Sequence, residues 1–100
     1  MPASLRTPTE VASDLGQRIE ALRLARNWRR ATLAERAGVG LSTVQRFEKT
    51  GHITIENLLK IADALDRLHE LEQLFAPAHA RTLAALFRAS ATTLPKRGRR

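Results

Sequence analysis

The amino-acid sequence predicts a single all-helical domain, and three observations lead to this prediction. The apolar residues are mostly leucine and alanine, with few β-branched residues, and this composition favours helices over strands. Apolar residues recur at intervals of three and four, as on one face of a helix. No segment alternates between apolar and polar residues as a half-buried strand does. A chain of 100 residues fits one domain with a small core.

The first helix is expected at about residues 8–26, after a loose N-terminal arm, residues 1–7. Thr7 can cap this helix, Pro8 suits its first position, and Glu10 can close a capping box. The apolar residues expected to share its inner face are Val11, Leu15, Ile19 and Leu22. The polar residues expected on the opposite face include Glu10, Gln17, Arg18 and Arg23.

Two short helices with a glycine-containing turn between them are predicted next. The first covers about residues 31–37 and the second about residues 41–49. Gly38 follows the first helix, where a left-handed residue commonly ends a helix. Gly40 gives the turn a second flexible point, and Gly51 ends the second helix. The residues expected to face the core are Leu33, Ala34, Ala37, Val39, Val44 and Phe47.

Two further helices complete a predicted five-helix domain, which covers residues 8–75. The fourth covers about residues 55–65 with Thr54 as its cap, and the fifth covers about residues 67–75 with Asp66 as its cap. Their apolar residues are Leu58, Leu59, Ile61, Ala62 and Leu65, followed by Leu68, Leu71, Leu74 and Phe75. Because proline cannot continue a helix, Pro77 ends this pattern.

The rest of the chain divides into a short helical segment, residues 76–91, and a basic tail, residues 92–100. In the segment, Leu83, Leu86 and Phe87 have helical spacing. Together with the apolar residues just before them, they exceed what four short helices need. They either complete the small core or form a contact with a second copy or another partner, and we favour the homodimer.

The charge balance favours a polyanionic partner, with nucleic acid first. Lys and Arg number 17 against 10 Asp and Glu, which gives a net charge of +7. Four of these positive charges lie in the last five residues, so the remainder carries 7 − 4 = +3. Charge therefore supports DNA binding without establishing it.

The same composition argues against an enzyme, a cofactor-binding protein and a membrane protein. The absence of cysteine excludes disulfides and thiolate chemistry. The three histidines lack metal-ligand spacing, and no serine has the His and acid pattern of a nucleophile. Every apolar stretch is too short to cross a membrane, and a signal-peptide core is absent. We therefore expect no catalytic residues, no cofactor, no metal and a cytoplasmic protein.

Three motifs at continuous spacing carry a resemblance to a known family. They are L-A-x-x-A-G-V at residues 33–39, V-x-x-F-E at residues 44–48 and T-I-x-x-L-L-x-I-A-x-A-L at residues 54–65. On these motifs, residues 14–65 resemble the Xre/Cro-type helix-turn-helix domain of bacterial and phage repressors. The resemblance implies a lambda-repressor-like bundle whose recognition helix enters the major groove of DNA. The helix start at Pro8, the leucine-rich residues 68–75 and the basic tail are also similar to HipB-like antitoxins.

The resemblance implies DNA contacts at the start of the first helix of the pair and along the second. These positions are Arg29, Arg30, Leu41, Ser42, Thr43, Gln45, Arg46 and Lys49. Arg46 can bond to guanine O6 and N7, Gln45 can pair with adenine, and Leu41 can touch a thymine methyl. Arg46 could instead pair with an acidic neighbour such as Glu48, and in this context we favour the DNA contact.

The chain departs from the family pattern at two places. The family usually has Thr-Gln where this chain has Arg29 and Arg30, and arginine also holds phosphate. The family usually has Ser or Thr as the cap of the recognition helix, where this chain has Gly40. Two further residues have structural interpretations: Glu48 is expected to pair with Arg36, and Trp28 to pack between the first two helices.

The sequence therefore predicts a homodimeric transcriptional repressor that binds a palindromic operator in double-stranded DNA. The resemblance to HipB-like antitoxins favours an autoregulating antitoxin of a HipBA-like toxin–antitoxin operon, with a HipA-like kinase toxin as a candidate partner. Two alternatives remain open. One is a stand-alone phage or bacterial Xre-type regulator, and the other is a protein-interaction module that has lost specific DNA binding.

Overall fold

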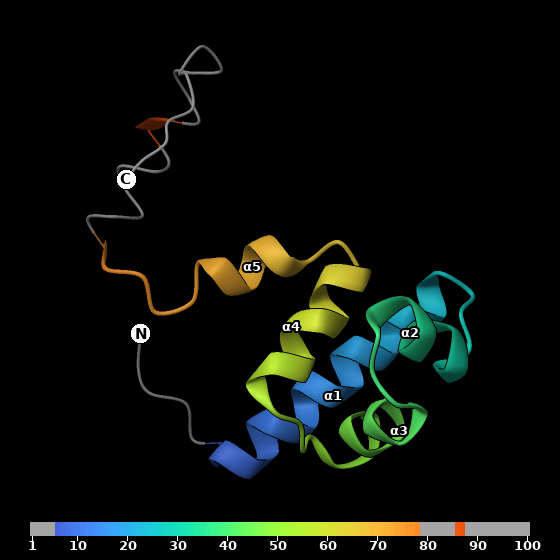
Figure 1. The fold of residues 1–100 in the computed structure, drawn as a ribbon. Coiled ribbons are helices and arrows are strands. Elements are labelled where there is room, and N and C mark those ends of the chain that lie inside the picture. Colours follow the sequence, from blue (N-terminus) through green and yellow to red (C-terminus); the bar gives the residue numbers. More distant parts are fainter. Residues whose placement is uncertain (1–5, 79–85, 88–100) are drawn as a thin grey trace.

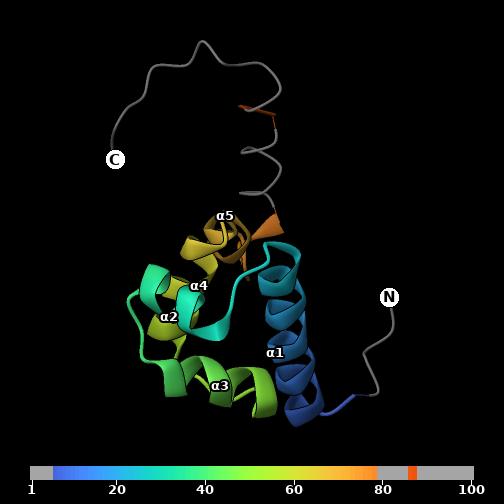
Figure 2. The same cartoon turned by 90° about the vertical axis from the view of Figure 1, so that its right-hand side faces the viewer.

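The computed structural model describes residues 6–78 and 86–87, and this part of the chain is helical without strands. Its helices are α1 (Pro8–Ala25), α2 (Arg30–Ala37), α3 (Leu41–Thr50), α4 (Ile55–Ala64) and α5 (Leu68–Glu72). Helices α3 and α5 lie at opposite ends of the bundle in two perpendicular views (Figure 1, Figure 2). The all-helical five-helix prediction is confirmed.

Two of the helix starts form through the threonine caps expected from the sequence. The hydroxyl of Thr7 accepts a hydrogen bond from the backbone N of Glu10 at 3.1 Å. The Glu10 carboxylate accepts one from the backbone N of Thr7 at 2.9 Å, which completes a capping box. The hydroxyl of Thr54 accepts a hydrogen bond from the backbone N of Asn57 at 3.1 Å. Helices α1 and α4 therefore begin with amide groups satisfied by their own side chains.

The fifth helix is shorter than predicted, and its expected cap is wrong. Asp66 has a left-handed backbone with φ of 61°, which ends the preceding helix rather than starting the next. Its carboxylate is 3.0 Å from an Nη2 of Arg26 and pairs with it. Helix α5 begins after Arg67, without a side-chain cap, and ends at Glu72. The left-handed backbone of Asp66 and its ion pair with Arg26 thus stand in place of the predicted cap.

The core lies among α2, α3 and α4, and α1 packs against it. Its buried members are Leu33, Ala34, Val44, Phe47, Ile61 and Leu65. Ile19 and Leu22 of α1 pack on this cluster, as their spacing predicted, and Trp28 packs beside them. Val11 and Leu15 remain partly exposed, so the first half of the apolar face of α1 is not covered by the described chain.

Two glycines allow α1 and α3 to approach closely. A Cβ atom on Gly16 would overlap the carbonyl group of Phe47, so the two backbones meet where only hydrogen fits. Gly51 ends α3 with a left-handed φ of 85°, and a Cβ atom there would overlap the backbone of Ala12. These two contacts fix the position of α3 against α1.

Other sequence predictions fall mostly outside the described residues. Residues 1–5 of the arm, most of the 76–91 segment and the whole 92–100 tail are among these. Leu86 and Phe87 are described as helical, and both are more than half exposed. Among the residues that the structure describes, no helix has the length and apolar character needed to span a membrane.

Candidate nucleic-acid interface

Helix α3 has one buried face and one open face. Val44, Phe47 and Glu48 are buried against the rest of the bundle. The predicted DNA-contacting residues on the open face are Leu41, Ser42, Gln45, Arg46 and Lys49, all of them exposed. Thr43 is partly buried between the two faces. The structure therefore brings the predicted positions of this helix together on one accessible surface.

The turn before α3 sets the angle between α2 and α3. Gly38 has a left-handed φ of 75°, as the sequence predicts, and its N–H donates to the carbonyl of Ala34 at 2.9 Å. The N–H of Val39 donates to the same carbonyl at 3.0 Å, while its side chain packs on the core. Gly40 then has an extended backbone from which α3 starts. Two short helices joined by this tight turn form a helix-turn-helix unit.

A buried ionic cluster anchors the inner face of α3. The Glu48 carboxylate accepts hydrogen bonds from Arg23 Nε at 2.7 Å and Arg23 Nη2 at 3.0 Å. It also accepts one from Arg30 Nε at 2.9 Å. Arg23 Nη1 donates to the carbonyl of Trp28 at 2.8 Å. One carboxylate thus joins α1, α2 and α3, and its bidentate pair with Arg23 restricts the rotation of α3.

This cluster corrects two predictions from the sequence. Glu48 is structural as expected, but its partners are Arg23 and Arg30 instead of Arg36. The Arg36 guanidinium instead lies over the Trp28 ring, 4.7 Å from its centroid, in a cation–π contact. Arg23 was expected on the polar face of α1, yet only 5% of it is exposed, and it is buried together with Glu48.

Sequence reasoning missed Arg23, although one signal pointed to it. The V-x-x-F-E motif places an acid directly after Phe47, a core residue. A buried carboxylate needs a cation or several donors, so the motif itself calls for a buried partner. Helical periodicity could not say which arginine answers this need, because the partner lies 25 residues earlier in the chain.

Arg30, at the start of α2, is paired with two carboxylates and is also partly exposed to solvent. Its Nε is held by Glu48, and its Nη2 lies 3.7 Å from a carboxylate oxygen of Glu20. The pKa of Arg30 is raised above its ordinary value, first by the hydrogen bond to Glu48 and then by the charge of that carboxylate. The side chain remains partly exposed. It can present a permanently charged, positioned guanidinium to solvent.

The other basic residues predicted to contact DNA have fewer ion pairs than Arg30. Arg29 is the N-cap residue of α2 and is exposed. Within residues 6–78 and 86–87, the side chains of Arg29, Arg46 and Lys49 form no ion pair. The alternative in which Arg46 pairs with Glu48 is therefore not what the structure shows. These side chains can therefore bind a polyanion without first breaking an ion pair.

The N-termini of α2 and α3 also differ from those of α1 and α4. Neither Arg29 at the start of α2 nor Gly40 at the start of α3 forms a side-chain cap. The first-turn amide groups of these two helices are thus not occupied by a capping side chain. Helix N-termini of this kind are suited to phosphate oxygens.

The loop after α3 extends the same surface and was missed from the sequence. A shallow pocket of about 300 Å³ is lined by Thr43, Arg46, His52, Ile53, Thr54 and Asn57. His52 and Asn57 therefore lie beside two predicted DNA-contacting residues. The sequence held no spacing signal for them, because the α3–α4 turn brings His52 and the first turn of α4, which carries Asn57, next to α3.

The fold and the open face of α3 define a helix-turn-helix DNA-binding domain of the lambda-repressor-like type. Residues 19–72, more than half of the chain, match the family model described as helix-turn-helix, of the Xre/Cro type. The chain belongs to this family and is a DNA-binding transcription regulator. A comparison with curated protein sequences gave no significant match.

Proposed function

We propose that the protein is a homodimeric, sequence-specific repressor that inserts α3 into the major groove of a palindromic double-stranded operator. It acts without catalysis and without a cofactor, by covering promoter DNA. The observation that carries this proposal is the open face of α3, where Gln45, Arg46 and Lys49 are exposed over a helix locked from beneath by Glu48. A rigid helix with unpaired polar side chains is suited to reading base edges.

The residues divide into those that read bases and those that hold the backbone. Arg46 reaches guanine O6 and N7, and Gln45 lies next to it on the same open face for an adenine. Arg29, Arg30 and Lys49 hold phosphates, whose neutralisation supplies most of the affinity. Specificity therefore depends mainly on Arg46, and overall affinity on the remaining cations.

The test compares DNA from upstream of the gene with a random duplex over a range of salt concentrations. We expect tight, salt-dependent binding of the upstream DNA by the wild-type protein. Arg46→Ala should remove about 1–3 kcal/mol of the preference for it. Lys60→Ala is the matched control, because Lys60 carries the same charge on α4 and pairs with Glu56 at 3.8 Å. It should leave the preference unchanged.

The opposite result would favour the interaction-module alternative. If both duplexes bind equally weakly and Arg46→Ala changes neither, α3 does not read sequence in this protein. A uniform loss on both duplexes in Arg46→Ala would instead assign Arg46 to phosphate and move base reading to Gln45 or Leu41.

We further propose a narrower role, as the cytoplasmic, autoregulating antitoxin of a HipBA-like operon with a HipA-like kinase as its toxin. The resemblance to HipB-like antitoxins supports this role, and a stand-alone Xre-type regulator is the alternative. Co-expression with the product of the adjacent gene, followed by purification on a tag attached to that product, tests it. Recovery of a stoichiometric complex is expected, and its absence would leave the stand-alone regulator.

A further inference from the structure

Glu20 of α1 is an acidic residue that lies beside Arg30, one of the predicted phosphate-binding arginines. A carboxylate oxygen of Glu20 lies 3.7 Å from Nη2 of Arg30 and 3.8 Å from Nη2 of Arg23. Both distances fit ion pairs, but both exceed the length of a hydrogen bond. Glu20 therefore attracts Arg30 by its charge, without a hydrogen bond, in a contact that another anion can replace.

The two carboxylates at Arg30 differ in strength of contact and in access to solvent. Glu48 accepts a hydrogen bond from Arg30 Nε at 2.9 Å, and its side chain is only 1% exposed. The side chain of Glu20 is 35% exposed, and that of Arg30 is 45% exposed. The pKa of Arg30 is raised first by the hydrogen bond to Glu48, then by the charge of Glu48, and least by the charge of Glu20. An anion that arrives from solvent thus competes with Glu20 for Arg30, and not with Glu48.

The charges around Arg30 are balanced. Arg23 and Arg30 carry two positive charges, and Glu20 and Glu48 carry two negative ones. The cluster as it stands therefore adds no net charge that would attract a polyanion. Because Glu48 is buried and Glu20 is not, Glu20 is the acid of this cluster that lies in the path of an incoming phosphate.

We propose that Glu20 competes with a DNA phosphate for Nη2 of Arg30 and so weakens the binding of the DNA backbone by this protein. When DNA binds, the phosphate replaces Glu20, while Arg30 Nε stays bonded to Glu48 and keeps the side chain in position. Because phosphate contacts carry no sequence information, the competition lowers the affinity for all duplexes alike and leaves the sequence preference to α3. This inference rests on the proposed function only in taking DNA as the source of the phosphate.

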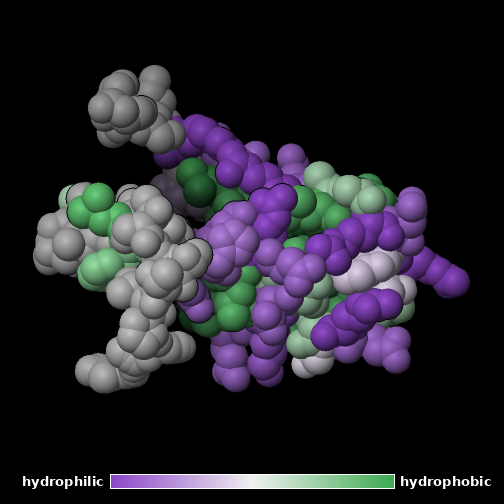
Figure 3. Space-filling model, turned by 90° about the horizontal axis from the view of Figure 1, so that it is seen from above, coloured by the Kyte–Doolittle hydropathy of each residue, from purple (hydrophilic) through white to green (hydrophobic). Residues whose placement is uncertain are grey.

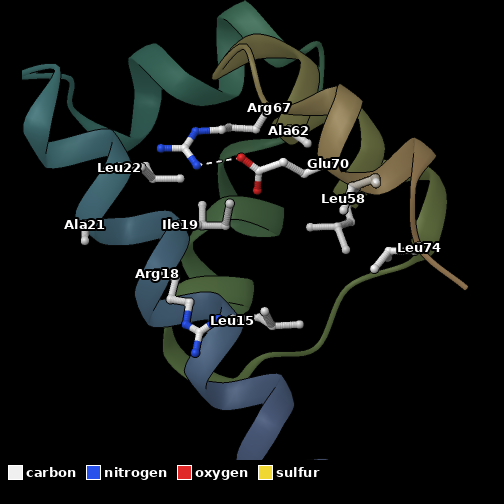
Figure 4. Close-up of a pocket in the computed structure, with 11 residues that line it drawn as sticks. Leu15, Arg18, Ile19, Ala21, Leu22, Leu58, Ala62, Arg67, Glu70 and Leu74 are labelled. Carbon is white, nitrogen blue, oxygen red and sulfur yellow. Dashed lines mark hydrogen bonds and ion pairs between the residues drawn. The ribbon is translucent and has the colours of Figure 1, made fainter. Parts of the chain in front are cut away.

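The ion pair of Arg67 with Glu70 provides a matched control at the other end of the bundle. Arg67 Nη1 lies 2.6 Å from a carboxylate oxygen of Glu70, beside an apolar groove (Figure 4). The view from above, onto the α5 side of the molecule, shows hydrophobic patches between hydrophilic residues (Figure 3). Helix α5 and α3 lie at opposite ends of the bundle (Figure 1). Glu70→Gln therefore removes the same charge from beside an arginine, away from the proposed DNA contact.

The first test measures Kd for the upstream duplex and for a random duplex at one salt concentration. Glu20→Gln, which keeps the shape of the side chain and removes its charge, should bind both duplexes about two- to five-fold more tightly, the range for one exposed ion pair. The ratio of the two affinities should not change. Glu70→Gln should have a smaller effect, because salt screens a charge this far from the DNA. An equal gain in the two variants would assign the effect to net charge and overturn the proposal, as would a loss of affinity in Glu20→Gln.

The second test asks whether the effect of Glu20 depends on Arg30. Arg30→Gln leaves Glu48 with its bidentate partner Arg23, so this variant should keep the helical content of the wild-type protein. When Glu20→Gln is added to Arg30→Gln, the DNA affinity should rise no more than it does in Glu70→Gln. A full gain without Arg30 would show that Glu20 repels the DNA directly, and this would contradict the competition.

A titration with inorganic phosphate separates this inference from the proposed function. The Nε–H of Arg30 is followed by NMR spectroscopy while phosphate replaces chloride at constant ionic strength. Half-saturation should need less phosphate in Glu20→Gln than in the wild-type protein, and equal requirements would overturn the proposal. If the wild-type protein binds neither duplex while this difference is found, the DNA-binding proposal fails and the competition stands. If the upstream duplex is bound and Glu20→Gln changes the binding of neither DNA nor phosphate, the competition fails alone.

Discussion

Phe47 in α3 and Phe75 after α5 have opposite environments at the two ends of the same small fold. Phe47 is 1% exposed and lies in the core, whereas Phe75 is 93% exposed. The end that carries α3 is further secured by the buried pair of Glu48 with Arg23. The end that carries α5 has surface ion pairs such as Arg67 with Glu70. The comparison shows that buried contacts are concentrated beneath α3, while apolar surface is left open at the other end.

The largest expected difference is between these two phenylalanines themselves. Phe47→Ala should lower the free energy of unfolding by about 3–5 kcal/mol, because it removes a fully buried ring and leaves a cavity. Phe75→Ala should change it by less than about 0.5 kcal/mol, since an exposed side chain away from the core contributes little. Urea unfolding at low protein concentration, where dimerisation adds no stability, measures both. Similar losses in the two variants would show that Phe75 packs within its own chain.

The second difference concerns two glutamates. Glu48→Ala should cost about 3–5 kcal/mol, because it removes the bidentate partner of the buried Arg23 and leaves only Glu20, 3.8 Å from Arg23 Nη2, as an opposite charge. Glu56→Ala should cost at most about 0.5 kcal/mol, since its carboxylate is exposed and lies 3.8 Å from Lys60. Thermal unfolding followed by circular dichroism gives both values.

A milder variant keeps this prediction testable if Glu48→Ala does not fold. Glu48→Gln retains the shape of the side chain but not its charge, and it should lie between the wild type and Glu48→Ala. A neutral effect of Glu48→Gln would mean that hydrogen bonding alone, rather than charge, holds α3 in place.

The sequence could predict the features that depend on a few neighbouring residues. Thr7, Thr54, Gly38 and Gly51 each form the helix boundary that their local chemistry indicates. The core leucines and Phe47 followed from helical spacing, and the open positions of α3 followed from the family resemblance. These signals succeed because a cap or a face is encoded within one or two turns of helix.

Features that depend on distant residues could not be predicted in the same way. The partner of Asp66 is Arg26, 40 residues earlier, and this pair accompanies the reversed backbone that shortens α5. The partner of Glu48 is Arg23, which periodicity had placed on the solvent side. His52 joined the candidate interface only through the fold of the α3–α4 turn. In each case the three-dimensional arrangement brings together groups whose proximity no local pattern in the sequence encodes.

The cap of α4 provides a smaller test, in which a threonine that caps a helix is compared with an exposed threonine that does not. Thr54→Ala should cost about 1 kcal/mol, because it removes the hydroxyl that accepts from the backbone N of Asn57. Thr9→Ala, an exposed change in the first turn of α1, should alter stability by no more than about 0.5 kcal/mol. Equal effects in urea unfolding would contradict the structural role of the cap at α4.

The smallest expected effect is at the uncapped start of the recognition helix. Gly40 has φ of −72° and ψ of 152°, close to the −78° and 156° of the capping residue Thr54. A Cβ atom at Gly40 would come no nearer than 3.8 Å to Thr43 Oγ1, so serine fits without displacing a neighbour. Gly40→Ser should therefore raise the free energy of unfolding by a few tenths of a kcal/mol, since its hydroxyl can accept from a first-turn amide.

The DNA affinity of the same variant decides what the open amides of α3 do. We expect Gly40→Ser to bind the upstream duplex as the wild-type protein does, because the family usually has Ser or Thr at this position. A gain in stability accompanied by weaker, less salt-dependent binding would show that these amides donate directly to a phosphate. A loss of stability would instead mean that α3 starts with a backbone into which a serine cap does not fit.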